Sequence, residues 1–402
     1  MALVPLHMRR GIQMPYQILT RDDHFRSDGR PKRILALDGG GLRGVLSLGI
    51  LGRIEELLRE RHGCGEGFRL CHYFDLIAGT STGAIIAAAL AQGRSVQEVS
   101  DKYFSLGQRV FQRSLFRQEL LRARYDERVL VSELKDLFGV DTTLGGPHLL
   151  TGLLVVIKRL DSGSPWPVSN NPRGRYFVAG ASGRMGNGDY PLWQVVRAST
   201  AAPSYFEPES ITISGGPDLS PVTGSFVDGG VSPFNNPALQ ALMYATLGGY
   251  RVGWETGGEK LLLVSVGTGV ADPAVGRAKL AASHALRALK SVLQDCAVLQ
   301  ETMLQWMSES PTARVIDREL GTLTGDLLNG VPLMSYLRYN VDLRPDSVRA
   351  LDETLAGTEE VASLSAMDVP ENMEALHRLG RLAAARDVRA ADFGTAFDLP
   401  PA

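Results

Sequence analysis

One short segment sets the architecture of this 402-residue chain. It reads Phe74-Asp75-Leu76-Ile77-Ala78-Gly79-Thr80-Ser81-Thr82-Gly83 and continues as Ala84-Ile85-Ile86-Ala87-Ala88-Ala89-Leu90. An apolar strand that passes through Gly-x-Ser-x-Gly directly into a helix is the context of a nucleophile elbow. Such a turn leaves no room for side chains two residues before and after the serine, so glycine suits Gly79 and Gly83. Ser81 is therefore a candidate nucleophile, and an ordinary strand-to-helix turn is the competing interpretation.

A second glycine-rich turn follows an expected buried strand at residues 32–38. It reads Gly39-Gly40-Gly41-Leu42-Arg43-Gly44, and we call it the glycine loop. An amphipathic pattern over residues 45–61 predicts a helix directly after it. The loop fits the dinucleotide-binding pattern G-x-G-x-x-G. It also fits an oxyanion hole, because a glycine run at a helix N-terminus exposes N–H groups that can stabilise a negatively charged oxygen.

The chain beyond the glycine loop favours the oxyanion hole. Dinucleotide binding requires a second strand that ends in an acidic residue about 20 positions on. That region is still helical here and ends in Arg59-Glu60-Arg61, while the next strand ends in Ser81. Within the loop, the Arg43 guanidinium could hold a phosphate group or brace the loop. A surface salt bridge is the alternative role for this side chain.

A serine hydroxyl needs a base in order to act as a nucleophile. Histidine is the usual base, but none of the seven histidines follows a strand in a glycine-rich turn, and His72 lies at the wrong end of the nucleophile strand. A carboxylate does occupy such a position, in Ser225-Phe226-Val227-Asp228-Gly229-Gly230. In a doubly wound sheet, ligands bind beyond the carboxyl ends of the strands. We therefore expect Asp228, Ser81 and the glycine loop to share one edge of the sheet.

These residues predict a Ser–Asp dyad. Asp228 would accept the proton of Ser81, and the N–H groups of Gly40 and Gly41 would stabilise the tetrahedral oxyanion. A carboxylate of ordinary pKa is a weak base toward serine, so its surroundings must raise its basicity. The competing interpretation of Asp228 is a turn-forming residue before Gly229 and Gly230.

Strands and helices alternate along the rest of the chain. Continuous apolar strands flanked by helices predict a mostly parallel sheet covered on both faces. We expect further strands at residues 153–157, 175–179, 261–266 and 336–343, a loop at 162–173, a long helix at 274–307, and helices within 344–385. Residues 1–31 are polar and irregular, and we interpret them as an arm.

Composition narrows the class of protein. With 21% charged residues and a formal net charge of -2, the chain has no basic excess that would indicate nucleic-acid binding. Its three cysteines have neither metal-ligand spacing nor a disulfide pattern, which fits a reducing cytoplasm. We expect neither a signal peptide nor a spanning helix, so any membrane contact would be peripheral. Four arginines and five apolar residues alternate within residues 111–124, which suits either a membrane surface or a packed helix with a basic face.

Three motifs in order, Asp38-Gly-Gly-Gly-Leu-Arg-Gly44, Gly79-Thr-Ser-Thr-Gly83 and Asp228-Gly-Gly230, resemble the patatin-like phospholipase family. Asn235-Asn236-Pro237, the segment from Arg197 to Phe206, and Gly267-Thr-Gly269 fit the same pattern. The resemblance covers roughly residues 31–343. One departure is Asp-Gly-Gly where Asp-Gly-Ala is also common.

The resemblance implies a three-layer α/β/α fold and lipid acyl hydrolase activity without a metal or other cofactor. It implies Ser81 as the nucleophile, Asp228 as the base and Gly39 to Gly44 as the oxyanion hole. It divides the chain into an N-terminal arm (1–31), a patatin-like domain (32–343), and a helical C-terminal extension with a tail (344–402).

The resulting hypothesis is a cytoplasmic serine esterase, in peripheral contact with the membrane, that cleaves acyl chains from phospholipids or other lipid esters. A lipid alcohol in place of water would make it a transacylase. Two rivals are a nucleotide-binding protein built on the glycine loop and a non-catalytic binding module that keeps the fold. No residue indicates the head group, the oligomeric state or gating by a second messenger.

Overall fold

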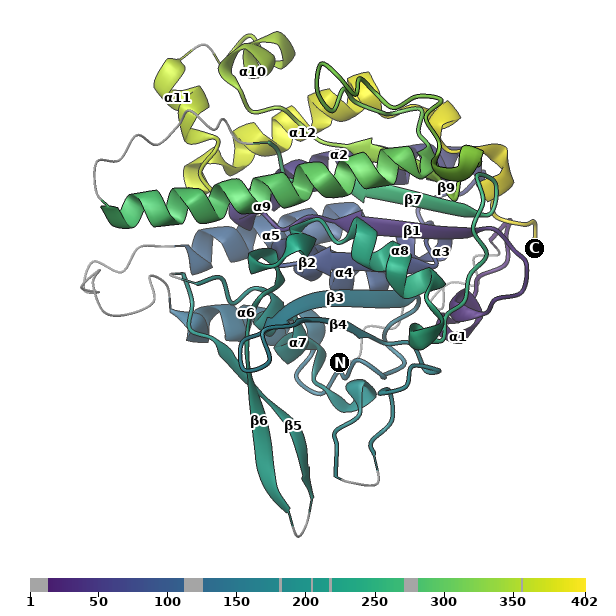
Figure 1. The fold of residues 1–402 in the computed structure, drawn as a ribbon, viewed down its shortest axis with the longest axis vertical. Helices are drawn as coiled ribbons and strands as arrows, with labels where there is room; N and C mark the ends of the chain where they lie inside the picture. The colour runs from purple at the N-terminus through teal and green to yellow at the C-terminus, as the bar shows by residue number, and fades with distance from the viewer. Residues whose placement is uncertain are drawn as a thin grey trace.

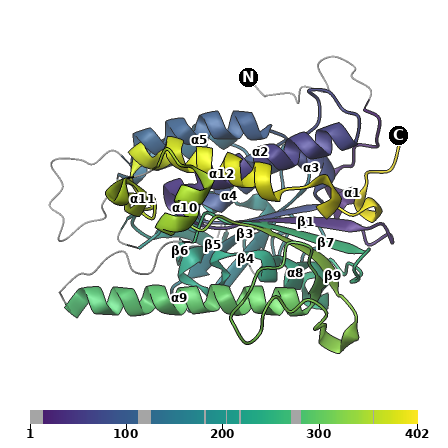
Figure 2. The same ribbon diagram turned by 90° about the horizontal axis from the view of Figure 1, so that it is seen from above.

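A central sheet runs through the molecule, and helices pack against both of its faces (Figures 1 and 2). The computed structural model describes residues 14–111, 126–180, 183–203, 205–216, 219–270, 281–355 and 357–402. Within these residues nine strands form one sheet, in which each strand of the series β5-β6-β3-β2-β1-β7-β9-β8 is hydrogen-bonded to the next, and β4 also pairs with β3. The strands are β1 (Lys32–Leu37), β2 (Leu76–Thr80), β3 (Gly152–Arg159), β4 (Pro165–Ser169), β5 (Glu209–Gly216), β6 (Leu219–Asp228), β7 (Leu261–Val266), β8 (Ser308–Glu309) and β9 (Met334–Tyr339).

The sheet is mostly parallel, as predicted. β1 pairs in parallel with β2 and β7, β2 with β3, and β9 with β7 and β8. β4, β5 and β6 are the antiparallel strands. The carboxyl ends of the parallel strands therefore meet at one edge, where ligands bind in open α/β sheets.

The two faces of the sheet contribute to two apolar cores. Alternate side chains of a strand point to opposite faces: Leu35 and Leu37 of β1 pack in one core, and Ile34 and Ala36 in the other. The helices are α1 (Arg21–Phe25), α2 (Gly44–Arg61), α3 (Leu70–Tyr73), α4 (Thr82–Ala91), α5 (Val96–Val110), α6 (Glu127–Phe138), α7 (Leu192–Ser199), α8 (Ala238–Thr246), α9 (Ala281–Trp306), α10 (Pro345–Leu351), α11 (Thr358–Ser363) and α12 (Met373–Asp387). Side chains of α2, α4, α5, α6, α7 and α12 join the first core, and those of α8 and α9 the second (Figure 2). The prediction of a three-layer α/β/α fold is confirmed.

Two expectations about the region after β3 are wrong. Residues 175–179 form turns and bends instead of a strand, and Tyr176 and Val178 are exposed. β-propensity alone does not form a strand where no neighbouring strand is available for pairing and packing. Residues 162–173 were expected to be a loop, but they contain β4, which pairs antiparallel with β3. Its prolines, Pro165 and Pro167, fit an edge strand, where a missing N–H leaves no partner unpaired.

A two-stranded ribbon extends from the body of the molecule (Figure 1). It is made of β5, which the sequence did not predict, and β6, which is longer than its apolar end suggested and runs antiparallel to β3. The base of the ribbon lies at Asp228, the last residue of β6.

The N-terminal residues are more ordered than expected. Residues 14–31 include α1, whose His24 is buried with its Nδ1 2.9 Å from Asp75 Oδ1. Residues 344–402 contain α10, α11 and α12, as their pattern suggested. The long helix expected at 274–307 is present from Ala281, and its first residues lie outside the described part. The domain boundaries at 31/32 and 343/344 stay predictions.

The C-terminal extension packs closely on α2. A Cβ added to Gly49 of α2 would lie 2.7 Å from the His377 carbonyl oxygen of α12. A Cβ on Gly380 of α12 would lie 2.2 Å from the Leu46 carbonyl oxygen. Two glycines therefore let the backbones of the two helices touch, and α2 begins at the glycine loop.

This contact predicts opposite effects for two glycines of the same helix. Gly49→Ala should destabilise the protein by about 1–3 kcal/mol, because α12 must move away. Gly52→Ala should stabilise it by about 0.5–1 kcal/mol, because alanine is the better helix former and nothing lies within 4 Å of its added Cβ. Urea unfolding of both variants beside the wild type measures the difference. Equal effects would contradict the close contact between α2 and α12.

Candidate active site

Strand pairing brings Ser81 and Asp228 together. β2 pairs with β3 up to Thr80 opposite Val156, and β6 pairs with β3 up to Asp228 opposite Ile157. Ile157 also pairs with β4 on its other side, so β2 and β6 share one edge of β3. The two strands run toward each other along that edge, and their last residues occupy adjacent positions. The residue after β2 is Ser81.

Ser81 has the strained backbone of a nucleophile elbow. Its φ is 55°, a left-handed value that non-glycine residues seldom adopt. Its N–H donates to the Ser199 hydroxyl oxygen at 2.9 Å, which fixes the turn from the end of α7. The flanking glycines are sterically required: a Cβ on Gly79 would lie 2.3 Å from the Gly83 oxygen, and one on Gly83 would lie 2.3 Å from the Leu37 oxygen.

Asp228 accepts a hydrogen bond from the proposed nucleophile. The Ser81 hydroxyl donates to Asp228 Oδ2 at 2.5 Å, and the Gly230 N–H donates to Oδ1 at 2.6 Å. Asp228 is only 4% exposed. Burial raises the pKa of its carboxyl group from 3.8 to about 6, although both hydrogen bonds act to lower it. The carboxylate is therefore ionised near neutral pH but is more basic than an exposed aspartate.

The glycine loop lies against Ser81. A Cβ on Gly39 would lie 2.9 Å from Ser81 Cβ. The Gly39 N–H donates to the Asn235 carbonyl oxygen at 3.1 Å, and the Gly40 N–H donates to Thr82 Oγ1 at 3.2 Å. For the Gly41 N–H, the described part of the chain provides no acceptor. Of the two expected oxyanion donors, Gly41 is therefore free, and Gly40 is engaged by a hydroxyl next to Ser81.

Arg43 is a buried side chain, so the surface salt bridge considered for it is wrong. The residue is 9% exposed, and among the described residues its Nε and Nη1 have no hydrogen-bond partner. Burial lowers the pKa of its guanidinium to about 10, against the opposing effects of Asp38 and Tyr205. Its position within the glycine loop places an incompletely paired cation close to the predicted site.

Several residues that shape the glycine loop were not predicted to do so. Thr268 donates its hydroxyl to the Gly39 carbonyl oxygen at 2.9 Å, and Asn235 Nδ2 donates to the same oxygen at 3.2 Å. Both occur in motifs noted in the sequence, which gave no role for them. The Met367 carbonyl oxygen accepts the Leu42 N–H at 2.8 Å. Met367 belongs to the C-terminal extension and has no motif that could have placed it here.

The buried histidines have partners elsewhere. His24 pairs with Asp75, and His72 Nδ1 lies 2.9 Å from the Tyr16 hydroxyl. Among the hydrogen bonds of the described residues, none joins a histidine to Ser81 or Asp228. Within the same residues no group of three potential metal ligands occurs. No described helix combines the length and the apolar character that crossing a membrane requires.

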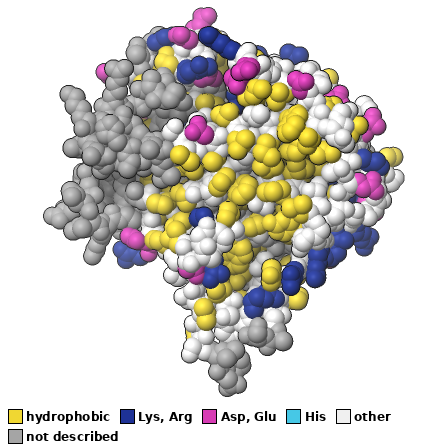
Figure 3. Space-filling view, in the orientation of Figure 1, with side chains coloured by type: hydrophobic (Ala, Val, Ile, Leu, Met, Phe, Trp, Pro, Cys, Tyr) yellow, Lys and Arg dark blue, Asp and Glu magenta, His cyan; other side chains and the backbone are white. Residues whose placement is uncertain are grey.

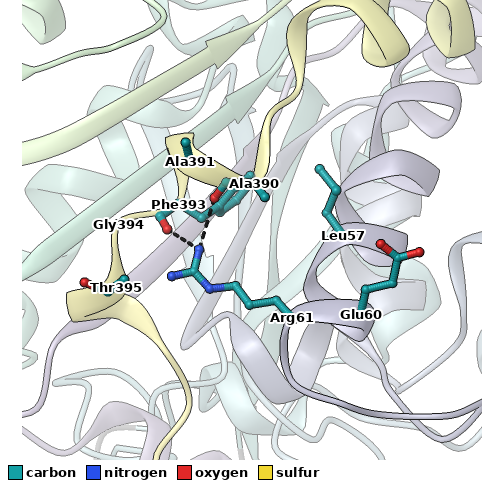
Figure 4. Close-up of a pocket in the computed structure, with 8 residues that line it drawn as sticks. All are labelled: Leu57, Glu60, Arg61, Ala390, Ala391, Phe393, Gly394 and Thr395. Carbon is teal, nitrogen blue, oxygen red and sulfur yellow. Dashed lines mark hydrogen bonds between the residues drawn. The ribbon is translucent and has the colours of Figure 1, made fainter.

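A surface pocket lies away from these residues, between the end of α2 and the segment after α12 (Figure 4). Arg61 lines it and donates to the carbonyl oxygens of Ala390 and Phe393. Because α2 rises 1.5 Å per residue, Arg61 lies about 25 Å along the helix from the glycine loop. The pocket is therefore separate from the site around Ser81.

The fold and the site together define an α/β protein with a serine–carboxylate pair at a nucleophile elbow. The family model for patatin-like phospholipase matches residues 35–242, about half of the chain. The chain belongs to the patatin-like phospholipase family, as its three motifs predicted. The model ends within α8, so residues 243–402 lie outside the match.

Named relatives support the same assignment. A cGAMP-activated phospholipase of Vibrio cholerae is 31% identical over 222 residues, which are 52% of this chain and 56% of that protein. Patatin-17 of Solanum cardiophyllum is 28% identical over 63% of this chain and 64% of its own length. An intracellular phospholipase A2 of Caenorhabditis elegans is 30% identical over 62% of this chain but only 20% of its own length. The chain thus spans about half of the Vibrio relative and a fifth of the Caenorhabditis relative.

Among solved structures, human GIVD cytosolic phospholipase A2 is similar with a TM-score of 0.49 and 13% identity. The similarity covers 92% of this chain and 61% of that structure.

The raised pKa of Asp228 predicts a cost in stability that depends on pH. Between pH 4 and 6 the unfolded chain releases this proton before the folded protein does, so the wild type loses stability as pH rises and the loss is complete above about pH 6. Asp228→Asn should therefore match the wild type below pH 4 and exceed it by up to about 3 kcal/mol at pH 7. Urea unfolding across this pH range measures the difference.

Asp75 provides a control of opposite sign. Burial would raise the pKa of this carboxyl group, but Arg33 and His24 outweigh burial and hold the pKa well below its usual range. Asp75→Asn should therefore be less stable than the wild type at pH 7. An Asp228→Asn variant that lost stability at pH 7 in the same way would contradict the raised pKa of Asp228.

Proposed function

We propose that this protein is a lipid acyl hydrolase in which Ser81 is the nucleophile and Asp228 its general base. The 2.5 Å hydrogen bond from the Ser81 hydroxyl to Asp228 Oδ2 carries the proposal. It joins a hydroxyl at a strained elbow to a buried carboxylate of raised pKa, and these are the features that activate a serine. Membership of the patatin-like phospholipase family supports the choice of lipid esters as substrates.

The first half of the reaction forms an acyl-enzyme. Ser81 Oγ attacks the ester carbonyl carbon while its proton passes to Asp228 Oδ2. The developing oxyanion is stabilised by the Gly41 N–H, and by the Gly40 N–H if the Thr82 hydroxyl gives up its bond. When the tetrahedral intermediate collapses, the C–O bond of the ester breaks and the leaving alcohol takes the proton from Asp228.

Water completes the cycle in the second half. Asp228 accepts a proton from a water molecule as its oxygen attacks the acyl carbon. The collapse of this second intermediate breaks the bond to Ser81, whose oxygen recovers the proton, and the fatty acid leaves. A lipid alcohol in place of water would transfer the chain instead, so a transacylase uses the same residues.

The nucleotide-binding alternative has less support. The glycine loop lies against Ser81 on one side, and a Cβ on Gly41 would lie 2.3 Å from the Met367 carbonyl oxygen on another. The strand that follows the loop in sequence ends at the nucleophile elbow, where dinucleotide-binding folds require an acidic residue.

Peripheral contact with a membrane is part of the proposal, because phospholipid substrates reside there. α9 crosses the face shown in Figure 1 and carries exposed apolar side chains, Val292 and Leu299. Figure 3 shows hydrophobic side chains gathered over the middle of this face. The basic stretch at residues 111–124, which the sequence suggested for membrane contact, lies outside the described residues apart from Phe111.

Removal of the Ser81 hydroxyl tests the proposal. Ser81→Ala should lower turnover of mixed phospholipid vesicles and of a p-nitrophenyl ester by at least about 10³-fold, because no acyl-enzyme can form. Fatty acid release and a fluorophosphonate probe measure the loss. Ser210→Ala, at an exposed serine of β5, is the matched control and should retain full turnover. Equal turnover by Ser81→Ala and the wild type would exclude this mechanism.

The rate should also depend on the ionisation of Asp228. Because the base acts as the carboxylate, kcat/KM should rise tenfold per pH unit below its pKa and level off above about pH 6. Initial rates from pH 4.5 to 8.5 on a soluble ester measure the profile, with circular dichroism confirming that the protein stays folded. An inflection near pH 7 or higher would instead indicate a histidine base.

A further inference from the structure

A second carboxylate lies at the entrance to the glycine loop. Asp38 follows β1 and directly precedes Gly39, and it is 7% exposed. Arg338 of β9 donates to both of its oxygens, from Nη1 to Oδ1 at 3.0 Å and from Nη2 to Oδ2 at 2.6 Å. When only side-chain atoms are counted, Asp38 and Arg338 are each 9% exposed. A bidentate pair of this kind fixes the orientation of both groups.

The register of the sheet explains how Arg338 reaches Asp38. Ala36 of β1 lies opposite Ser265 of β7, and Ser265 lies opposite Arg338 of β9. Asp38 is two residues after Ala36 and therefore on the same face. The Arg338 side chain reaches across β7, over roughly two strand spacings of about 4.8 Å each. Its Nη1 also donates to Ser265 Oγ of β7 at 2.7 Å.

The same polar cluster contacts the segment that holds the glycine loop on its other side. Ser265 Oγ donates to Asn236 Oδ1 at 3.3 Å. The neighbouring Asn235 bonds both the N–H and the carbonyl oxygen of Gly39. The two peptide groups that flank Gly39 are therefore fixed by Asn235 and, through Asp38, by Arg338.

We propose that Arg338 is a positioning residue for the glycine loop and that it acts through Asp38. The inference rests on the proposed function, since it assigns the loop a role in catalysis. Arg338 lies outside the part of the chain that matches the family model, which ends at residue 242. A strand beyond the matched region thus sets the position of N–H groups within it.

Positioning of this kind matters because oxyanion stabilisation depends on short distances. A displacement of about 1 Å can lower a rate by about 10²-fold. Without Arg338, the buried Asp38 carboxylate would lose two hydrogen bonds and would turn toward water or take up a proton. Either change would move the peptide that begins the loop.

A purely structural salt bridge is the competing explanation, and the chain offers a matched control. Arg33, at the opposite end of β1, donates from Nε to Asp75 Oδ2 at 3.1 Å, and this pair is also buried. Arg33→Met and Arg338→Met each break one buried Arg–Asp pair attached to the same strand. Only Arg338→Met should affect the glycine loop.

The experiment measures two quantities separately in the 402-residue chain: the amide exchange of the glycine loop and the rate of ester cleavage. Amide hydrogen exchange by mass spectrometry should show residues 38–44 exchanging at least about 10-fold faster in Arg338→Met, and unchanged in Arg33→Met. With a soluble ester, kcat of Arg338→Met should fall about 10–100-fold with KM within a factor of about three. Arg338→Lys should lie between, because an ammonium can replace the charge but not the bidentate geometry.

Each outcome decides the inference. Unchanged exchange of residues 38–44 in Arg338→Met overturns it, and so does an equal increase in Arg33→Met. If Arg338→Met does not fold, the same comparison between Arg338→Lys and Arg33→Lys decides. If Arg338→Met exchanges faster but the wild type cleaves no ester, Arg338 still positions the glycine loop, and the proposed function is rejected instead.

Discussion

The site depends on one edge of β3. β2 and β6 share that edge from opposite directions, and the register places Thr80 and Asp228 at consecutive positions along it. A slip of one residue in the pairing of β6 with β3 would turn the side chain of Asp228 to the other face of the sheet. Backbone hydrogen bonds of β3 therefore determine the distance between the serine and the carboxylate, which lie 147 residues apart in the chain. The Ser199 hydroxyl reinforces the same junction, because it donates to the Val156 carbonyl oxygen and accepts the Ser81 N–H.

The junction holds features that would be unfavourable elsewhere. Ser81 has a positive φ, Asp228 is a charged group with little access to water, and the glycines at the turn allow backbone contacts that any side chain would prevent. Such features persist only where the surrounding structure fixes them. Here β2 is buried along its whole length between β1 and β3, and α4 starts directly after Ser81. The same packing buries the Asp228 carboxyl group, and burial raises its pKa.

The sequence predicted the local elements of the site better than their supports. The elbow at Ser81, the loop at Gly39 and the carboxylate at Asp228 each combine a strand end with glycines, so short-range patterns were sufficient to find them. Only the structure shows that Asp228 is buried and that burial raises its pKa, because burial cannot be recognised from a local sequence pattern. The first part of β6, Leu219 to Gly224, was not predicted, because it includes Pro and Gly and lacks a strand pattern. The antiparallel direction of β6 depends on its pairing with β3, which no local pattern can show. The strand expected at residues 175–179 is absent for the opposite reason. These residues have a strand pattern, but no strand edge is available for them to pair with in the described part of the chain.

The supports of the glycine loop come from parts of the chain to which the sequence assigned no role in the site. The Met367 carbonyl oxygen contacts the loop from the C-terminal extension, Thr268 from the end of β7, and Arg338 through Asp38 from β9. A backbone carbonyl or a single arginine on a strand leaves no sequence signature, because its role depends on which strands become neighbours. All three residues lie after residue 242, where the family match ends. The matched region therefore contains Ser81, Asp228 and the glycine loop, whereas the rest of the chain supplies contacts that hold the loop in place.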